Sequence, residues 1–507
     1  MNRLIAFMIL SFAWACQAPD KTPINLEELT ISEIHHAYQN GNFSAEDLTK
    51  AYLDRIEALD SSLNSISITN SEALAIAKKL DEEFKKAGKL RPLHGIPLIV
   101  KDNINTTGLP TTAGALALAD FYPEEDAFII KKLVESGAII IGKSNMAEWA
   151  FSPMHSESST QGTIRNPYNL DHVPAGSSGG TGASIASNFG VIGLGTDTGN
   201  SIRGPSSHNA LVGFRTTLGL VSREGIVPLY LRNDVVGPMC RTVEDATKVL
   251  EAIAGFDPKD PITNFSKGKI PENYSQFLQK EGLKGTRIGV FRTLSEVNPD
   301  PEITALFNQS LKDMQALGAV IIDSVEVENF DSLRRNQWCP VFRQDLEKFL
   351  ADYVKRDTMK TLEDVIRVGT KSDYAREGLE RFRESDLPEN MAENCGDPFT
   401  DPERIAFREA IEKVMDSLML DALVYPSWNS KPARIDRFQE EYSGDNSQII
   451  APHTGQPAFT VPMGFTSGNL PAGLQFLGRM WSEPVLIRLV YSYEQGTLHR
   501  KAPNLTD

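Results

Sequence analysis

Cysteine and histidine are both scarce in this sequence. Of the 507 residues, only 4 are Cys and 8 are His. The cysteines lie far apart without a Cys-x-x-Cys pair, and no His-Glu-x-x-His motif occurs. These absences exclude a disulfide scaffold and a zinc site of the common spacings. We therefore expect no metal.

Positive charge is also in the minority. The chain has 51 Lys and Arg residues against 67 Asp and Glu, which gives a formal net charge of −16 at pH 7. Such a surface would repel phosphates, so nucleic acid is excluded as the main partner. The rest of the composition, 41% hydrophobic and 23% charged, is that of an ordinary globular protein and excludes disorder or coiled coil as the main architecture.

A hydrophobic run without charges stands at the amino terminus. It extends from Leu4 to Ala15, about 12 residues, which is shorter than the roughly 20 that span a bilayer but suits a secretory signal. The run ends at Ala15-Cys16, and a small residue followed by Cys resembles the lipobox of bacterial lipoproteins. We predict a signal in residues 1–15, a lipidated Cys16 and a tether in residues 16–24. A signal that is simply cleaved and a buried amphipathic start are the alternatives.

This amino terminus predicts an exported protein, either periplasmic or anchored by lipid to the bacterial cell envelope. Contact with a membrane is expected only through the lipid on Cys16.

Helical and strand patterns alternate through the body of the chain. Ser44 and Asp47 predict a capping box at the start of a helix. The apolar run from Ile96 to Val100 predicts a buried strand that ends at Lys101. Further predicted helices are 127–136, 181–187 and 242–254, and further predicted strands are 138–141, 191–194, 287–290 and 319–322. Such alternation indicates an α/β fold, a sheet with helices on both faces.

Residues 175–182 and 193–205 are rich in glycine and serine. A flexible linker would not lie between apolar strands or carry Asp197 and Arg203 in its middle. A phosphate-binding loop is a second interpretation, but the glycines of the second segment have one residue too many for Gly-x-Gly-x-x-Gly.

A serine nucleophile at Ser201 is the third interpretation. Glycines let main-chain N–H groups approach a reacting atom closely and adopt positive φ without strain. N–H groups that converge before Ser201 would form an oxyanion hole, in which each donor stabilises the transition state by about 2.7–4 kcal/mol.

A serine nucleophile requires a base, and the usual base is histidine. His94 and His208 lie nearest in sequence, but neither has the context of a nucleophile elbow. Lys101 is the better candidate if burial lowers its pKa, because at the ordinary value of about 10.4 only about 0.04% of lysine is neutral at pH 7. On position alone, a solvated lysine at a strand end is the simpler interpretation.

The motifs around Lys101 change that interpretation. The chain contains LHGIPLIVK at 93–101, GSSGG at 176–180 and GTDTGNSIR at 195–203. Together these motifs resemble the amidase signature family, with the family's interval of 24 residues between Ser177 and Ser201. The resemblance covers residues from about 25 to 260 and from about 415 to 500.

The resemblance implies the fold of that family, a single large α/β/α domain with a mixed central sheet covered by helices on both faces, across residues 25–507. It also implies that residues 328–415, which have a helical pattern and both charges but no motif, form a variable substrate funnel. Trp338 and Phe342 in that segment would line the pocket or belong to the core. No cofactor is implied.

The resemblance further implies a Ser-Ser-Lys triad. Ser201 would be the acyl-forming nucleophile and Lys101 the base, with Ser177, on a cis peptide bond, as the proton relay between them. Ser178 would support the relay by hydrogen bonding.

The resemblance also implies the positions of an oxyanion hole and of a pocket wall. The implied oxyanion hole consists of main-chain N–H groups of Thr198, Gly199, Asn200 and Ser201. The implied wall of the acyl pocket is Ala150 and Phe151.

Asn200 departs from the family, in which glycine is commonest at this position. If the position needs a positive φ, asparagine is the best substitute for glycine. Its amide could instead point into the site and contact the substrate. Asp197 and Arg203, on either side, are expected to pair and fix the loop.

The predicted function is hydrolysis of a carboxamide C–N bond, other than a peptide bond, to a carboxylic acid and ammonia or an amine. The partner is a small-molecule amide. The alternatives are the A subunit of a tRNA-dependent glutamine amidotransferase, against which the export signal counts, and a nucleotide-binding module that uses the Gly-rich loops. The sequence does not distinguish peptide, aryl, fatty and cyclic amides, amides from esters, or a monomer from a homodimer.

Overall fold

One large mixed sheet organises the structure. The computed structural model describes residues 23–335, 337–339, 341–384 and 395–505, so the predicted signal and Cys16 lie outside the described residues. Eleven strands are ordered β1-β3-β2-β6-β8-β7-β12-β13-β11-β9-β10. β2 is parallel to β3 and β6, whereas β6 is antiparallel to β8, which confirms the mixed sheet. The strands are β1 (Ile66–Thr69), β2 (Pro97–Lys101), β3 (Ile139–Ser144), β6 (Ile192–Asp197), β7 (Val212–Arg215), β8 (Val235–Cys240), β9 (Arg287–Val290), β10 (Val320–Ile322), β11 (Ala422–Pro426), β12 (Ala458–Thr466) and β13 (Leu470–Leu477).

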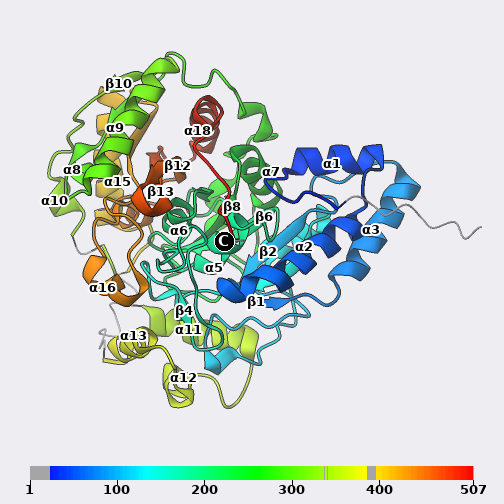
Figure 1. The fold of residues 1–507 in the computed structure, drawn as a ribbon. Coiled ribbons are helices and arrows are strands. Elements are labelled where there is room, and N and C mark those ends of the chain that lie inside the picture. The colour runs from blue at the N-terminus through cyan, green and yellow to red at the C-terminus, as the bar shows by residue number, and fades with distance from the viewer. Residues whose placement is uncertain (1–22, 336, 340, 385–394, 506–507) are drawn as a thin grey trace, which may run out of the picture.

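Helices cover the sheet on both faces (Figure 1), which confirms the predicted α/β/α architecture. α5 (Gly179–Ala186) and α6 (Arg203–His208) pack on each other, and α18 (Glu483–Thr497) packs on both α7 (Val243–Ile253) and α9 (Pro301–Ala316). The other α-helices are α1 (Ile31–Asn40), α2 (Ala45–Leu59), α3 (Ala73–Ala87), α4 (Phe128–Glu135), α8 (Arg292–Ser295), α10 (Phe330–Leu333), α11 (Phe342–Phe349), α12 (Leu362–Val368), α13 (Asp373–Glu384), α15 (Pro402–Ser417), α16 (Phe438–Glu441) and α17 (Ala451–Thr454). None of the described helices is long and apolar enough to span a membrane.

The elements predicted from apolar runs are present. All five residues of β2 are buried, and β3, β6, β9 and β10 occupy the other predicted strands, while α4, α5 and α7 occupy the predicted helices. Ser44 caps α2 with the predicted capping box, in which its hydroxyl accepts from the N–H of Asp47 and the Asp47 carboxylate accepts from the Ser44 N–H. The apolar runs of β2, β3 and β6 could be located in the sequence because all their residues are buried, whereas β10, with Val320 exposed, lies at the edge of the sheet.

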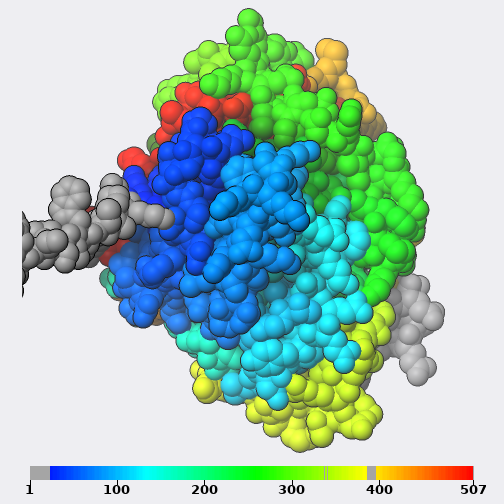
Figure 2. All heavy atoms as spheres, turned by 90° about the vertical axis from the view of Figure 1, so that its right-hand side faces the viewer, coloured from blue at the N-terminus to red at the C-terminus, as the bar shows by residue number. Residues whose placement is uncertain are grey.

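Residues 341–384, the middle part of the predicted substrate funnel at 328–415, form one end of the molecule and are called the funnel segment below. α10 and α15, at the two ends of the predicted funnel, pack together in a different apolar cluster. The funnel segment contains α11, α12 and α13 and a π-helical turn, η6 (Leu350–Val354). In Figure 1 and in Figure 2 this yellow-green part lies at the lower end, away from α18. Phe342, Phe349 and Phe382 pack in one apolar cluster with Phe121 and Trp149 of the body, so the segment has a small core of its own against the sheet domain.

A disulfide joins the two flanks of the funnel segment. Cys339 and Cys395 are bonded, with their Cα atoms 6.2 Å apart, across a sequence separation of 56 residues. Arg232 donates hydrogen bonds to the carbonyl oxygens of both half-cystines. Cys240 is a buried free thiol. Cysteine spacing excluded a disulfide scaffold but gave no indication of this single bridge.

Candidate active site

Lys101 is completely buried at the carboxyl end of β2. Its Nζ lies 2.8 Å from Ser177 Oγ, 2.8 Å from Thr196 Oγ1 and 3.5 Å from the Thr196 carbonyl oxygen. Burial lowers the pKa of Lys101 from 10.5 to about 7, although the negative charges of Asp197 and Asp234 oppose the shift. A large share of Lys101 is therefore unprotonated at neutral pH.

Three oxygens surround Lys101 Nζ, and they can accept all three N–H groups of the charged amine. They also suit the unprotonated amine, which has two N–H groups and one lone pair. The hydroxyl and carbonyl oxygens of Thr196 can accept the two N–H groups, which turns the lone pair toward Ser177. Asn103 Nδ2 donates to the same Thr196 hydroxyl at 3.1 Å and so fixes its position. In its unprotonated form, Lys101 can therefore accept the proton of Ser177, as a base must.

Ser177 follows Gly176 across a cis peptide bond, as the resemblance implied. The neighbouring glycines serve close packing, because a Cβ at Gly176 would overlap the carbonyl oxygen of Ser152 and one at Gly180 that of Asn145. The Ser178 hydroxyl donates to the Thr196 carbonyl oxygen at 3.2 Å. Ser178 thus reaches the predicted relay through Thr196 and not through a bond to Ser177.

The chain also contains the spacing of a phosphate-binding loop, at residues 137–144, with the letters GAIIIGKS. Residues Ile139–Ser144 are strand β3, in the interior of the sheet. Lys143 is completely buried and donates to the carbonyl oxygen of Ile104 at 2.6 Å. This stretch is therefore neither a loop nor a source of a free lysine for phosphate.

Ser201 lies four residues beyond the end of β6, beside Asn200. The Ser201 hydroxyl donates to Asn200 Oδ1 at 3.4 Å, and Asn200 Nδ2 donates to the carbonyl oxygen of Pro153 at 3.2 Å. Asn200 does not have a positive φ, so the conformational explanation for asparagine is wrong and its amide lies in the site. Because a hydroxyl has one proton, Ser201 must leave Asn200 before it can donate to Ser177.

The loop before Ser201 is fixed from its buried side. The Asp197 carboxylate pairs with Arg203 at 3.1 Å, as predicted, and also with Arg215 at 2.7 Å. Arg203 in addition donates to the Gly199 carbonyl oxygen at 2.7 Å. Arg203 and Arg215 lower the pKa of Asp197 to about 2 against the effect of burial, so this carboxylate stays charged.

The main-chain N–H groups of this loop are unpaired within the described part of the chain. Among the hydrogen bonds of the described residues, none is donated by the N–H groups of Thr198, Gly199, Asn200 or Ser201, and all four residues line the pocket. Free N–H groups beside a hydroxyl are what the oxyanion of an acyl-transfer reaction requires.

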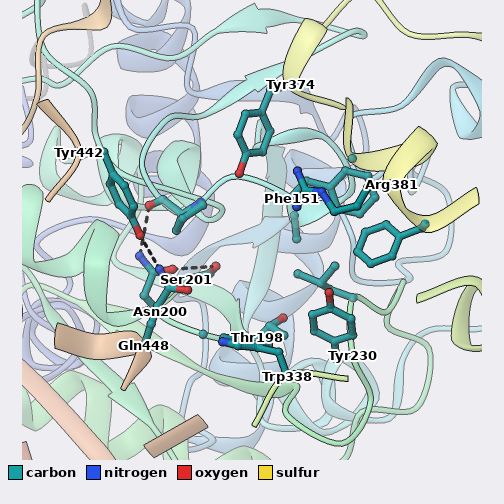
Figure 3. A pocket seen from close by; sticks show the side chains of 16 residues that line it. Phe151, Thr198, Asn200, Ser201, Tyr230, Trp338, Tyr374, Arg381, Tyr442 and Gln448 are labelled. Carbon is teal, nitrogen blue, oxygen red and sulfur yellow. Dashed lines mark hydrogen bonds between the residues drawn. The ribbon is translucent and has the colours of Figure 1, made fainter. Parts of the chain in front are cut away.

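A pocket of about 340 Å³ opens over Ser201, within the usual size of a small-molecule site. Figure 3 shows Tyr442, Gln448 and Asn200 on one side and Phe151, Arg381 and Tyr230 on the other. The complete lining is Ala150, Phe151, Pro153, Thr198, Gly199, Asn200, Ser201, Leu229, Tyr230, Trp338, Tyr374, Gly378, Arg381, Phe382, Tyr442 and Gln448.

Helix α13 builds one wall of this pocket. Tyr374, Gly378, Arg381 and Phe382 all line it, at the spacing of one helical face. Gly378 leaves room for the ring of Phe151, which a Cβ at that position would overlap. Arg381 is the one charged side chain in this lining.

The structure brings the predicted residues into two groups. Lys101, Ser177 and Ser178 are buried behind the loop, and Ala150, Phe151 and residues 198–201 line the pocket. Trp338 lines the pocket, whereas Phe342 packs behind the wall with its ring centroid 4.8 Å from that of Phe151.

Several residues at the site were not predicted. Thr196 lies inside the matched motif next to the nucleophile loop and could have been found there. Most of the others lie outside the quoted motifs, and only the folded chain brings them together: Asn103, Asp234, Tyr230, Tyr374, Gly378, Arg381, Phe382, Tyr442 and Gln448.

The two histidines nearest the motifs are structural. His94 Nε2 bonds to the Leu80 carbonyl oxygen, and the ring of His208 packs on that of Trp428 at a tilt of 47°. Within the part of the chain that the structure describes, no group of three or more His, Cys, Asp or Glu side chains is placed to hold a metal ion.

Comparisons with known proteins agree over nearly the whole chain. The family model described as Amidase matches residues 47–487. A probable amidase of Arabidopsis thaliana is 34% identical over 98% of this chain and 95% of the relative. The A subunit of glutamyl-tRNA(Gln) amidotransferase from Microcystis aeruginosa is 34% identical over 94% of this chain and all of the relative (100%). The solved structure of native peptide amidase from Stenotrophomonas maltophilia superposes with a TM-score of 0.83 at 33% identity, over 95% of this chain and 99% of that one.

Proposed function

The chain belongs to the amidase signature family and is an amide hydrolase, and we propose that it releases ammonia from primary carboxamides of peptides or acylated amino acids with bulky apolar side chains. The observation that carries the proposal is the wall over Ser201. Six aromatic side chains line it: Phe151, Tyr230, Trp338, Tyr374, Phe382 and Tyr442. Such a wall favours an aromatic or large aliphatic group on the acyl side of the scissile bond.

The likeness to a peptide amidase supports the same substrate class. That enzyme shares 33% of its residues with this chain over almost its full length.

In the proposed mechanism, Lys101 begins as the unprotonated base. Ser201 turns from Asn200 toward Ser177, and its proton passes to Ser177 as the proton of Ser177 passes to Lys101 Nζ. The Ser201 oxygen attacks the carbonyl carbon at the same time. The resulting oxyanion is bound by the free N–H groups of residues 198–201.

The same relay then runs in reverse. Charged Lys101 returns its proton through Ser177 to the leaving nitrogen, the C–N bond breaks and ammonia departs. Water attacks the acyl-enzyme with Ser177 and Lys101 again as base, and the acid is released with Ser201 restored.

Ammonia release tests the proposed substrate class. We expect kcat/KM for N-acetyl-phenylalanine amide to exceed that for N-acetyl-glycine amide by roughly 10–100-fold, because burial of a phenyl group contributes about 1.5–3 kcal/mol. Ser201→Ala should abolish both activities. Phe382→Ala should reduce the preference, whereas Phe265→Ala, which alters an exposed ring outside the pocket, should not. Equal kcat/KM for N-acetyl-glycine amide and N-acetyl-phenylalanine amide would contradict the proposal.

A second candidate is the A subunit of an amidotransferase, which the match to the Microcystis aeruginosa relative over its entire length favours. Such a protein works with partner chains on glutamine. Turnover of aromatic amides by the purified chain alone supports the hydrolase. Glutamine hydrolysis that appears only when partner chains are added would favour the amidotransferase.

We further propose that the protein is exported and held by a lipid on Cys16. The polar start, the apolar run and Ala15-Cys16 support this, and so does the Cys339–Cys395 bond, because disulfides persist mainly in oxidising compartments. Fractionation of expressing cells should place the wild type in the membrane fraction and Cys16→Ala in the soluble periplasm. Cys16→Ala that remains with the membrane would contradict the anchor, and wild type in the cytoplasm would contradict export.

A further inference from the structure

Asp234 is a buried carboxylate that reaches the site from behind the pocket. It stands directly before β8, whose first residue, Val235, pairs with Asp197 at the end of β6. Asp234 Oδ1 accepts from the Thr198 hydroxyl at 2.5 Å. Asp234 Oδ2 accepts from the N–H groups of Leu229 at 2.9 Å and Tyr230 at 3.1 Å. One side chain therefore holds three donors from two separate segments.

The two segments have different functions at the site. Thr198 begins the loop with the free N–H groups, and Leu229 and Tyr230 belong to the pocket wall. Figure 3 shows Thr198 and Tyr230 on the same side of the pocket. A side chain bonded to both fixes the distance between the place where the oxyanion forms and the wall that receives the acyl group.

We propose that Asp234 is a positioning residue that holds the oxyanion loop and the pocket wall in a fixed relation and directs negative charge toward Lys101. It touches neither the substrate nor the reacting atoms, and it acts through Thr198, Leu229 and Tyr230. The proposal rests on acyl transfer at Ser201 and not on the proposed substrate.

The charge of Asp234 acts on Lys101 differently from that of Asp197. Asp197 is bonded to Arg203 and Arg215, which offset its charge. No ion pair within 4 Å links Asp234 to a cation of the described residues. Burial raises the pKa of Asp234, and its three hydrogen bonds and the charge of Arg223 offset only part of that rise. The other groups around Lys101 Nζ are the uncharged oxygens of Ser177 and Thr196. Both carboxylates hold the pKa of Lys101 higher than burial alone would.

Asp234→Asn removes the negative charge of this side chain but keeps its ability to form the three hydrogen bonds. An asparagine at this position can accept both main-chain N–H groups with its oxygen, while its NH2 donates to the Thr198 hydroxyl. Alanine removes all three bonds, and Thr198→Val removes the bond to the loop alone. The substitutions are therefore Asp234→Asn, Asp234→Ala, Thr198→Val and the Asp234→Ala/Thr198→Val double variant.

The readout is the rate at which a fluorophosphonate labels Ser201 between pH 5.5 and 9, together with kcat and KM on an amide. We expect Asp234→Ala to label about 100-fold more slowly, the effect of one lost oxyanion donor, and to raise KM. Thr198→Val should lose a similar factor in labelling with KM unchanged. The double variant should lose no more than about twofold beyond Asp234→Ala, because both changes break the same connection.

Asp234→Asn should stay within about tenfold of wild type at pH 9, since its hydrogen bonds persist. The acid limb of its pH profile, the pH range in which labelling falls as Lys101 becomes protonated, should move to lower pH. The reason is that removal of a negative charge lowers the pKa of Lys101. The control is Asp245→Asn, a buried carboxylate in α7 that accepts from the Ile31 N–H, far from the pocket. It should change neither the labelling rate nor the acid limb.

A folded Asp234→Ala protein that labels within about threefold of wild type overturns the proposal. A double variant whose loss is the product of the two single losses also overturns it. If Asp234→Ala does not fold, two other results would overturn the proposal. One is a Thr198→Val protein that labels at the wild-type rate, and the other is an Asp234→Asn protein whose acid limb does not move.

Discussion

Replacement of Lys101 by methionine should make the protein more stable while it removes the base. Burial moves the pKa of Lys101 from 10.5 to about 7, a shift that corresponds to about 5 kcal/mol at 1.36 kcal/mol per unit. Below pH 7 Lys101 is protonated in both the folded and the unfolded chain. Folding then buries a charged amine, which destabilises the folded state by this whole amount. Methionine fills a similar volume without any charge, and it loses the three hydrogen bonds of Lys101 Nζ, which contribute about 0.5–1.5 kcal/mol each. The net gain at pH 7 is therefore about 0.5–3 kcal/mol.

The pH dependence of this gain identifies its cause. Between pH 7 and 10.5 the unfolded chain still binds the proton that folded Lys101 has released, so the stability of the wild type rises with pH relative to the variant. The advantage of Lys101→Met should shrink by about 3 kcal/mol between pH 6 and pH 9. All other titrating groups are common to the two proteins and cancel in the comparison.

Urea unfolding of both proteins at pH 6, 7.5 and 9, followed by tryptophan fluorescence, measures this difference. Fluorophosphonate labelling in parallel should fall by about 10²–10⁴-fold in Lys101→Met, the usual contribution of a general base. Labelling of the wild type should follow an acid limb near pH 7. A stability difference that is constant with pH would refute the idea that Lys101 is unprotonated in the folded protein, and so would labelling that is independent of pH.

Three further perturbations test other parts of the site. Asn200→Gly removes the acceptor of the nucleophile's hydroxyl and should change turnover of small amides by no more than about 10-fold; a loss of several hundredfold, measured as kcat/KM, would show that the asparagine is essential. Gly378→Ala places a methyl group against the ring of Phe151, so stability should fall by about 1–3 kcal/mol and KM should rise for aromatic amides but not for acetamide; an unchanged KM ratio would place the substrate elsewhere. The Cys339→Ser/Cys395→Ser variant should lose about 4 kcal/mol, the chain-entropy value for a loop of this length, with a lower Tm. Dithiothreitol should lower the Tm of the wild type in the same way and leave that of the variant unchanged.

The sheet was predictable only where strands are simple apolar runs. β2 and β6 end at the functional residues and could be located from their buried side chains. β8 contains Gly237 and Pro238, which are atypical of a central strand. In the structure a Cβ at Gly237 would overlap the carbonyl oxygen of Phe214, so glycine is required where neighbouring backbones approach closely. A glycine that is required because a distant segment packs closely against it produces no local sequence pattern from which the strand could be predicted.

The same division holds within the site. Lys101, Ser177 and Ser201 stand in motifs whose letters and spacing carried the prediction. Thr196 and Asp234 act through hydrogen bonds between segments 36–95 positions apart, and no periodicity in the chain reports such pairing.

The catalytic residues and the pocket wall are held by different means, and this decides which substitutions alter chemistry and which alter specificity. Lys101 and the loop before Ser201 extend from the ends of β2 and β6, which are paired with each other and buried on all sides. One wall of the pocket comes from α13, which lies in the funnel segment. That segment packs on the body through one apolar cluster, and a disulfide joins its two flanks to each other. A loosened wall changes how the acyl group is held but leaves the proton path from Ser201 to Lys101 intact. Variants in the funnel segment should therefore alter KM differently for each amide, while a small fluorophosphonate, which makes little use of the wall, continues to label Ser201 at the wild-type rate.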